Sequence, residues 1–245
     1  MRNTMAIFIK QMRSMVKSPA LLVQGAMFAI MIVAFSFIPD RYCDLCVPAV
    51  ICETCLRENP LHSLPTPSIS GVFTVMFAGF VMISSASALV QEDKTTQNLR
   101  FLTMSGMKPF QYLTGTGAAL LIIAAALLVF YAMAGRHFGM NTLLFLAVTT
   151  SGALVSILLG IAIGLSKVPV FAFPVSIIFG MGPMLSQFNE TLARWMYFTY
   201  TQQVNLAIYN IGYGLQPRTF LIIGINGLVI LLTFVWMHRK GELRW

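Results

Sequence analysis

Six long apolar runs without a single charged side chain dominate this sequence. They cover residues 20–39, 69–90, 113–134, 142–165, 168–188 and 220–237. A helix of about 20 apolar residues spans the roughly 30 Å hydrocarbon core of a bilayer, where backbone groups must pair within the chain. The runs therefore predict an all-α membrane protein with six transmembrane helices. We expect no soluble catalytic domain, since the spans and their connections use up most of the 245 residues.

The charged residues are distributed unevenly among the segments between these runs. The chain has 16 Lys and Arg against 8 Asp and Glu, a net charge of +8. If the N-terminus lies inside, eleven cations and three acids fall in the cytoplasm, and five of each fall outside. Because cytoplasmic loops of membrane proteins are enriched in Lys and Arg, we predict a multi-pass plasma-membrane protein with both termini cytoplasmic. The net charge then needs no nucleic-acid partner.

Residues 1–19 have the pattern of an amphipathic helix. Met5, Phe8, Ile9 and Met12 recur at spacings of three and four, and another face carries the cations Lys10, Arg13 and Lys17. Such a helix lies in the membrane interface with its cations toward lipid headgroups. It is either a simple anchor or an elbow helix that clamps the first span to a cytoplasmic partner.

Residues 91–109 form the longest predicted cytoplasmic connection. Asp93 or Thr95 is placed to cap a short helix, and Gly106 with the following proline is placed to end it. Leu99 and Leu102 give this helix one apolar edge. The segment is therefore either an interfacial turn or a docking site for another protein.

The predicted extracellular loop, residues 40–68, contains all four cysteines of the chain. They form two C-x-x-C pairs, Cys43 with Cys46 and Cys52 with Cys55. One interpretation is a tetrahedral zinc site with His62 as a spare ligand. A second is two disulfides, which an oxidising compartment favours, and a third is redox-active or labile thiols. The spacing leaves these alternatives open.

Two further patterns each have two interpretations. Residues 189–217 mix polar and aromatic side chains, which is typical of an aromatic belt or of a re-entrant segment that caps the outer side. Gly160 and Gly164 form a G-x-x-x-G pattern, which allows two helices to approach closely. The partner helix lies either within the same subunit or across a dimer seam.

The chemistry of most membrane enzymes and ion-coupled carriers is missing from the sequence. The interiors of the six runs contain no ionisable residue, although such residues usually mark ion or proton pathways. The sequence also lacks the G-x-x-x-x-G-K-[ST] phosphate loop and the H-E-x-x-H zinc motif. We therefore expect that this chain is not an enzyme and binds no cofactor of its own, with zinc in the cysteine loop left open as one of the three interpretations above.

The segment from Gln91 to Leu99, followed by Leu102, a Ser-Gly pair ending at Gly106, and Gly115, resembles one known family. It is similar to the acidic segment after the second span in permease subunits of type 2 ATP-binding cassette exporters. The N-terminal amphipathic helix, the six spans, the proline-rich fifth span and the outer segment agree with this family. The cysteine loop departs from it, so no role is carried over to that loop.

The resemblance implies that residues 1–245 form one transmembrane permease domain, which exports a hydrophobic or amphipathic drug, lipid or peptide by alternating access. Its partners would be a second permease subunit, identical or homologous, and two ATPase subunits that bind ATP and Mg²⁺. The ATPase-coupling residues are expected to be Glu92, Asp93, Thr96, Leu99, Leu102 and Met104. The substrate path along the permease seam is expected to be lined by Phe28, Phe35, Phe73 and Phe77.

A second function remains open at this point. The chain could be a non-transporting membrane assembly or receptor subunit, whose extracellular cysteine loop binds a metal ion or a protein partner.

Overall fold

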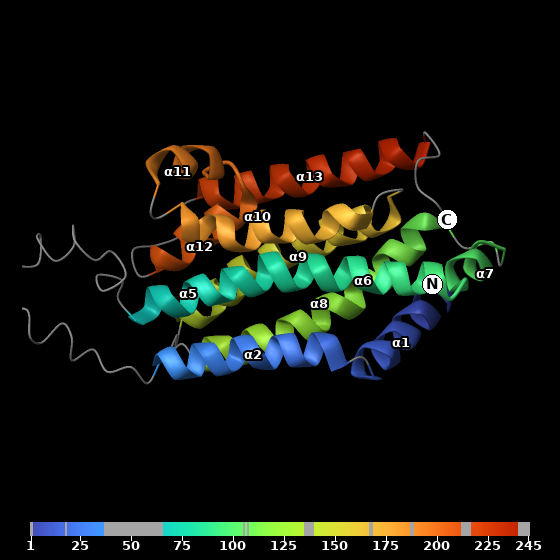
Figure 1. Ribbon diagram of the computed structural model, residues 1–245, viewed down its shortest axis with the longest axis horizontal. Coiled ribbons are helices and arrows are strands. Elements are labelled where there is room, and N and C mark those ends of the chain that lie inside the picture. The colour runs from blue at the N-terminus through green and yellow to red at the C-terminus, as the bar shows by residue number, and fades with distance from the viewer. Residues whose placement is uncertain are drawn as a thin grey trace, which may run out of the picture.

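The computed structural model describes residues 2–17, 19–36, 66–104, 106, 108–134, 140–166, 169–186, 189–211 and 217–239. Every regular element in these ranges is a helix. Most of the helices lie side by side along the long axis of the molecule (Figure 1). In chain order they are α1 (Arg2–Lys17), α2 (Pro19–Ser36), α5 (Thr66–Met76), η1 (Phe77–Val81), α6 (Met82–Thr95), α7 (Asn98–Met104), α8 (Pro109–Ala134), α9 (Met140–Leu165), η2 (Pro169–Phe171), α10 (Ala172–Leu185), α11 (Glu190–Met196), α12 (Tyr200–Tyr209) and α13 (Pro217–Arg239).

Four helical segments in the described part of the chain are long and apolar enough to cross a membrane. They are Gly71–Thr95, Pro109–Met133, Thr142–Leu165 and Pro217–Met237. The prediction of an all-helical, membrane-embedded protein is therefore confirmed. The first and fifth predicted spans coincide with shorter apolar helices, Val23–Ala34 within α2 and Ala172–Leu185, so a count of six complete spans stays a prediction.

Prolines explain why the fifth apolar run forms a short helix. The run begins with the 3-10 turn η2, and the α-helix α10 starts only at Ala172. Pro174 is tolerated because it lies in the first helical turn, where its missing N–H has no intrahelical partner. Pro183 lies inside α10 near its end. The 14 residues of α10 cover about 21 Å, less than the roughly 30 Å of a hydrocarbon core.

The second predicted span is one helical rod with a π-helical turn in its middle. This turn, η1, joins α5 to α6 and packs against α10. A Cβ added to Gly79 would lie 2.7 Å from the carbonyl oxygen of Phe179, and one added to Gly180 would lie 2.6 Å from the Cβ of Phe80. The two backbones therefore touch at a pair of glycines, a contact that no larger residue permits.

The G-x-x-x-G pattern of α9 is used inside the subunit. A Cβ on Gly160 would lie 2.5 Å from the carbonyl oxygen of Ile83, and one on Gly164 would lie 2.9 Å from the Cβ of Val90. Both contacts are made with α6. The structure thus decides between the two interpretations of this pattern in favour of packing within one chain.

Aromatic side chains join α2 and α8 to the middle of the second span. The Tyr131 hydroxyl donates a hydrogen bond of 2.9 Å to the carbonyl oxygen of Gly25. The Phe77 ring packs edge-on against Tyr131 at 5.0 Å and against Phe28 at 6.3 Å. All three rings are buried, so this cluster fixes α2 against the bundle.

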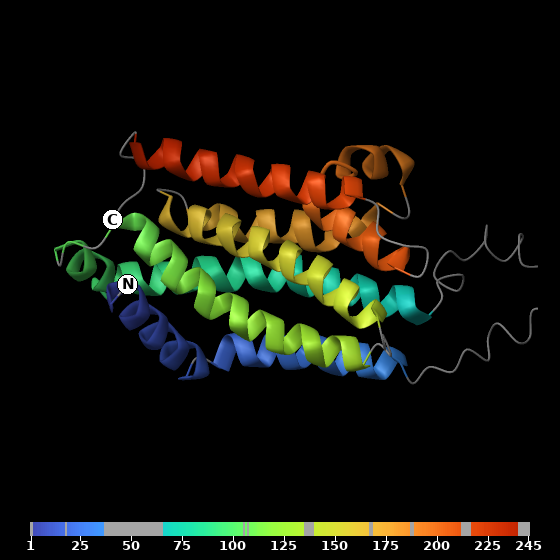
Figure 2. The same cartoon turned by 180° about the vertical axis from the view of Figure 1, so that it is seen from behind.

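The bundle has two distinct ends. Figures 1 and 2 place α7, the start of α1 and the end of α13 at one end, and α11 and α12 at the other. We call them the α7 end and the α12 end. Residues 40–65 of the cysteine loop and the side chain of Phe35 lie outside the described residues, and the last three residues of the predicted loop belong to α5.

We expect Gly79→Ala to lower the stability of the purified protein, because the new methyl group overlaps the α10 backbone. Overpacking of this kind costs about 1–3 kcal/mol, measurable as a lower melting temperature in detergent. Gly224→Ala is the matched control, since a Cβ there meets no atom within 4 Å. An equal melting temperature for Gly79→Ala and the parent protein would contradict the backbone contact.

Candidate functional site

The carboxylate of Asp93 is buried at the α7 end of the bundle. A buried charge is costly unless it is paired. Helix α6 continues through Thr95, so Asp93 lies in the last turn of this helix. The sequence had suggested Asp93 as the cap of a following short helix, and the structure does not place it there. The Asp93 side chain is only 5% exposed. Removing a carboxylate from water is expensive unless donors replace the water, so its neighbours decide whether this position is stable.

Three side chains from α1 and α8 supply the short hydrogen bonds, and Asn98 Nδ2 at the start of α7 adds a longer one of 3.5 Å to Oδ1. Lys10 Nζ in α1 lies 2.7 Å from Asp93 Oδ1, and Gln11 Nε2 lies 2.6 Å from Oδ2. The Tyr112 hydroxyl at the start of α8 donates to Oδ2 at 2.9 Å. One carboxylate therefore joins α1, α6 and α8, and we call this set of residues the Asp93 hub.

Small and apolar residues hold α1 close enough for the hub to form. Ile7, one turn before Gln11, is 2% exposed. It lies against α8 at Gly115, where a Cβ would come within 3.0 Å of the Ile7 side chain. The amphipathic α1 thus points one polar residue, Gln11, inward together with its apolar face. The sequence pattern placed Lys10 on the lipid-facing polar side, and the structure pairs it with Asp93 instead.

The neighbouring residue Lys94 ties α6 to α9. Its Nζ donates to the carbonyl oxygens of Gly164 at 2.7 Å and Ser166 at 3.1 Å. The last carbonyl groups of a helix lack intrahelical partners and carry partial negative charge, so an ammonium group from another helix stabilises them. Adjacent residues of α6 therefore connect this helix to α1 and α8 on one side and to α9 on the other.

Two residues with positive φ define the segment that carries α7. Gln97 has φ of 56° and Gly106 has φ of 76°. The left-handed region is uncommon for residues other than glycine. At Gln97 the turn is supported by Thr96, whose hydroxyl donates to the carbonyl oxygen of Glu92 at 2.7 Å. The predicted helix end at Gly106 and Pro109 is confirmed, since α7 stops at Met104 and α8 begins at Pro109.

The apolar face that α7 exposes differs from the predicted one. Leu99 is 3% exposed within the core, and Leu102 packs against that core. Phe101 and Met104 are instead 72% and 73% exposed. These two residues are three apart and share a face. The sequence reasoning did not include Phe101, although its spacing from Met104 is a signal that could have found it.

The predicted coupling residues separate into two groups. Glu92, Thr96 and Met104 are exposed at the α7 end. Asp93 and Leu99 are buried in contacts within the subunit, and Leu102 is intermediate. The buried residues can only position the exposed ones, so a partner would meet Glu92, Thr96, Phe101 and Met104.

The predicted substrate-path phenylalanines belong mostly to the core. Phe28 is 6% exposed and Phe77 is fully buried, in edge contact with each other. Phe73 is half-buried and packs against the same core. Phe28 and Phe77 are thus buried against each other and hold α2 against η1.

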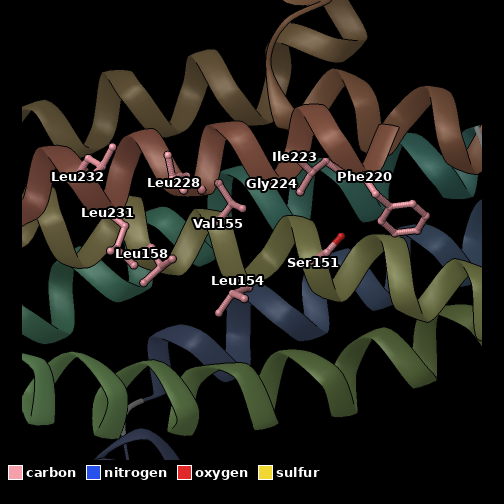
Figure 3. Close-up of a pocket in the computed structure, with 11 residues that line it drawn as sticks. Ser151, Leu154, Val155, Leu158, Phe220, Ile223, Gly224, Leu228, Leu231 and Leu232 are labelled. Atoms are coloured by element: carbon pink, nitrogen blue, oxygen red, sulfur yellow. The ribbon is translucent and has the colours of Figure 1, made fainter. Parts of the chain in front are cut away.

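An apolar groove with a volume of about 420 Å³ runs between α9 and α13 (Figure 3). Gly224 and Gly227 form its floor on α13, and leucines from both helices form its walls. Ser151 is its one hydroxyl residue, and the Oγ atom already donates to the carbonyl oxygen of Val148 at 2.7 Å. The groove therefore suits an alkyl chain and offers almost nothing to a polar ligand.

At the other end, α12 carries polar residues into the bundle. Tyr200 is fully buried, stacks on Phe179 at 5.2 Å and shares a hydrogen bond of 2.7 Å with Ser156. The Ser186 hydroxyl donates to Gln202 Oε1 at 3.1 Å. This helix is thus packed among α5, α9, α10 and α13, which is compatible with a re-entrant segment.

The cysteine site cannot be placed in this structure. Cys43, Cys46, Cys52 and Cys55 all lie outside the described residues. Within the described ranges, no group of three or more His, Cys, Asp or Glu side chains could hold a metal ion. Zinc, disulfides and reactive thiols therefore remain alternatives for the cysteine loop.

No protein-family model, curated protein or solved structure matches this chain. The functional conclusion therefore depends on the residues and on their geometry.

We expect Asp93→Ala to loosen α1 while the spans remain folded. The substitution leaves buried Gln11 and Tyr112 without their acceptor, and stranding a buried donor costs about 1–3 kcal/mol. Hydrogen–deuterium exchange of residues 2–17 should rise about tenfold, which corresponds to about 1.4 kcal/mol.

Glu92→Ala is the control for this measurement, because Glu92 is exposed and lies next to Asp93 in the same helical turn. Unchanged exchange in α1 of the Asp93→Ala variant would show that the hub does not hold this helix.

Proposed function

We propose that this chain is the permease subunit of a two-component, ATP-driven exporter similar to type 2 ATP-binding cassette exporters. One observation carries the proposal. The short helix α7 at one end of the bundle exposes two large apolar side chains, and its first residue, Asn98, donates to Asp93 Oδ1 at 3.5 Å, which links α7 to the hub that joins α1, α6 and α8. A partner that moves this helix would move the spans with it.

The exposed face of α7 has the character of a protein-docking surface. Phe101 and Met104 are each more than 70% exposed and lie at a helix-to-helix turn beyond the apolar spans. Aromatic residues and methionine are enriched in interfaces, where they fill pockets on the partner. Leu99 and Leu102 anchor the same helix to the core, so the surface is presented on a rigid support.

The contacts behind α7 supply a route for mechanical coupling. The hub joins α6 to α1 and α8, and Lys94 joins α6 to the end of α9. Close packing at Gly160 and Gly164 then holds α6 and α9 together along their length. A displacement of α7 is therefore passed to α6, α8 and α9 as one body.

The remaining architecture supports a permease that depends on another subunit for energy. The sequence contains no phosphate loop and no ionisable residue in the interior of its apolar runs, so ATP and Mg²⁺ would bind to a partner ATPase present in two copies. In this proposal α2 and α10 complete a set of six spans, both termini lie in the cytoplasm of a plasma-membrane protein, and α1 is the elbow helix. A second permease subunit completes the transporter.

The substrate class in this proposal is hydrophobic or amphipathic. The surfaces that the chain offers at membrane depth are apolar, as the groove between α9 and α13 illustrates. An ion or a sugar would find no charged and few polar partners along such surfaces, and leaving a charge unpaired in hydrocarbon is costly.

We expect an ATPase with a phosphate-loop motif to co-purify with the full-length chain from membranes of its source cells. The double variant Phe101→Asp, Met104→Asp should lose at least about tenfold of this ATPase, because hot-spot residues at interfaces contribute 2 kcal/mol or more. Mass spectrometry and ATP hydrolysis by the eluted complex measure the effect.

Thr191→Asp provides a control that also introduces an aspartate on the surface, since Thr191 is exposed in α11 at the opposite end of the bundle. Absence of any ATPase from the parent preparation would refute the exporter proposal. Equal recovery with the double variant would refute the assigned docking face alone.

A further inference from the structure

Two large aromatic side chains at the α12 end project from the molecule. Trp195 in α11 is 78% exposed, and Phe198 in the turn between α11 and α12 is 68% exposed. In water this exposure would be unfavourable by about 25 cal/mol for each Å² of apolar surface. We call Trp195 and Phe198 the α11 aromatic pair and ask which environment surrounds it.

A hydrogen bond to α13 sets the depth of this pair in the membrane. Asn226 Nδ2 donates to the carbonyl oxygen of Phe198 at 3.0 Å. Asn226 follows Pro217, the first residue of the α13 span, by nine positions, which is about 13 Å along the helix axis. Side chains in a helix lean toward its N-terminus, so the turn lies somewhat less deep, but still below the end of the span.

The surface of α13 at this level is apolar and uncovered by other described residues. Leu221, Ile225 and Leu228 are between 52% and 61% exposed, and the whole segment Pro217–Met237 is apolar enough to cross a bilayer. A turn that is hydrogen-bonded to this helix within its apolar stretch therefore lies at the depth of the lipid chains. The aromatic pair is placed where tryptophan and phenylalanine are favourable.

Two cations lie beside the aromatic pair, and one of them, Arg218, stands at the start of the α13 span, the level expected for lipid headgroups. Arg218 is the second residue of α13, and its guanidinium carbon is 5.3 Å from the centre of the Tyr197 ring. Arg194 is exposed in the last turn of α11. The described carboxylates, Glu92 and Asp93, lie at the α7 end and pair with neither arginine, while the side chain of Glu190, four residues before Arg194 in α11, lies outside the described residues.

We propose that α11 and the following turn form a lipid-binding wedge in the bilayer leaflet at the α12 end. Trp195 and Phe198 insert among the upper acyl chains, and Arg194 and Arg218 bind the phosphate groups of phospholipids. The inference depends on α13 crossing the bilayer and holds whether or not the chain works with an ATPase.

Fluorescence quenching in reconstituted vesicles tests the aromatic part. The chain has three tryptophans, so Trp236→Phe with Trp245→Phe leaves Trp195 as the sole tryptophan, whose emission is excited selectively over that of the tyrosines. Phosphatidylcholine brominated near the carbonyl end of its acyl chains should quench Trp195 strongly, while iodide present on both sides of the bilayer should quench it weakly. A variant that keeps only Trp236, which is 52% exposed on α13, is the control for lipid contact.

Two results would overturn the wedge. Strong quenching by iodide without quenching by bromolipid would place Trp195 in water. Protection from both quenchers would place it in a contact with another protein chain, such as a second copy.

The arginines are tested in the same sole-Trp195 protein. Brominated phosphatidylglycerol should quench Trp195 more than brominated phosphatidylcholine, because two cations attract an anionic headgroup. The double substitution Arg194→Gln, Arg218→Gln should abolish this preference and keep the quenching by bromolipid itself. A preference that survives the double substitution would refute phosphate binding by these arginines.

Discussion

The carboxylate of Asp93 is the interaction on which the arrangement of the α7 end depends. It is nearly inaccessible to water, so its charge is tolerated only because Lys10, Gln11 and Tyr112 surround it with donors. Those donors belong to α1 and α8, which must therefore meet α6 at this point. The requirement to satisfy one charge thus fixes the position of three helices and, through Lys94, of a fourth.

Close backbone contacts between helices add to the contacts that Asp93 makes. Gly160 and Gly164 bring α9 against α6, and Gly79 and Gly180 bring η1 against α10. In hydrocarbon, helices gain little from burying apolar surface, and close packing supplies much of their association. The Asp93 hub at the α7 end and the glycine contacts along the helices therefore hold the spans together, so that a displacement of α7 would move them as one unit.

Much of the architecture followed from sequence because the physics involved is local or one-dimensional. The apolar runs predicted the helices, because a backbone exposed to lipid must pair its N–H and C=O groups within the protein and a helix does this within one segment. The stop at Gly106 and the interrupted fifth run followed from glycine and proline geometry. At the candidate site, the coupling role of the segment stays a prediction. Met104 is exposed, the exposed Phe101 was not among the predicted residues, and the edge formed by Leu99 and Leu102 packs against the chain's own core. In a seven-residue helix both faces carry apolar residues, and only the neighbouring core shows which one is covered.

The sequence by itself determined that this chain is a helical membrane protein, where its long apolar segments lie, and that the connection at residues 91–109 is a candidate for docking. Those properties depend on hydropathy, length and backbone preference, which follow directly from the order of the residues in the chain. The tertiary structure alone decided that Asp93 is a buried hub, that Gly160 and Gly164 pack within the subunit, and that Phe198 is hydrogen-bonded to α13 below the end of its span. These outcomes join residues from different helices, and the identity of the partner depends on how the helices meet in space.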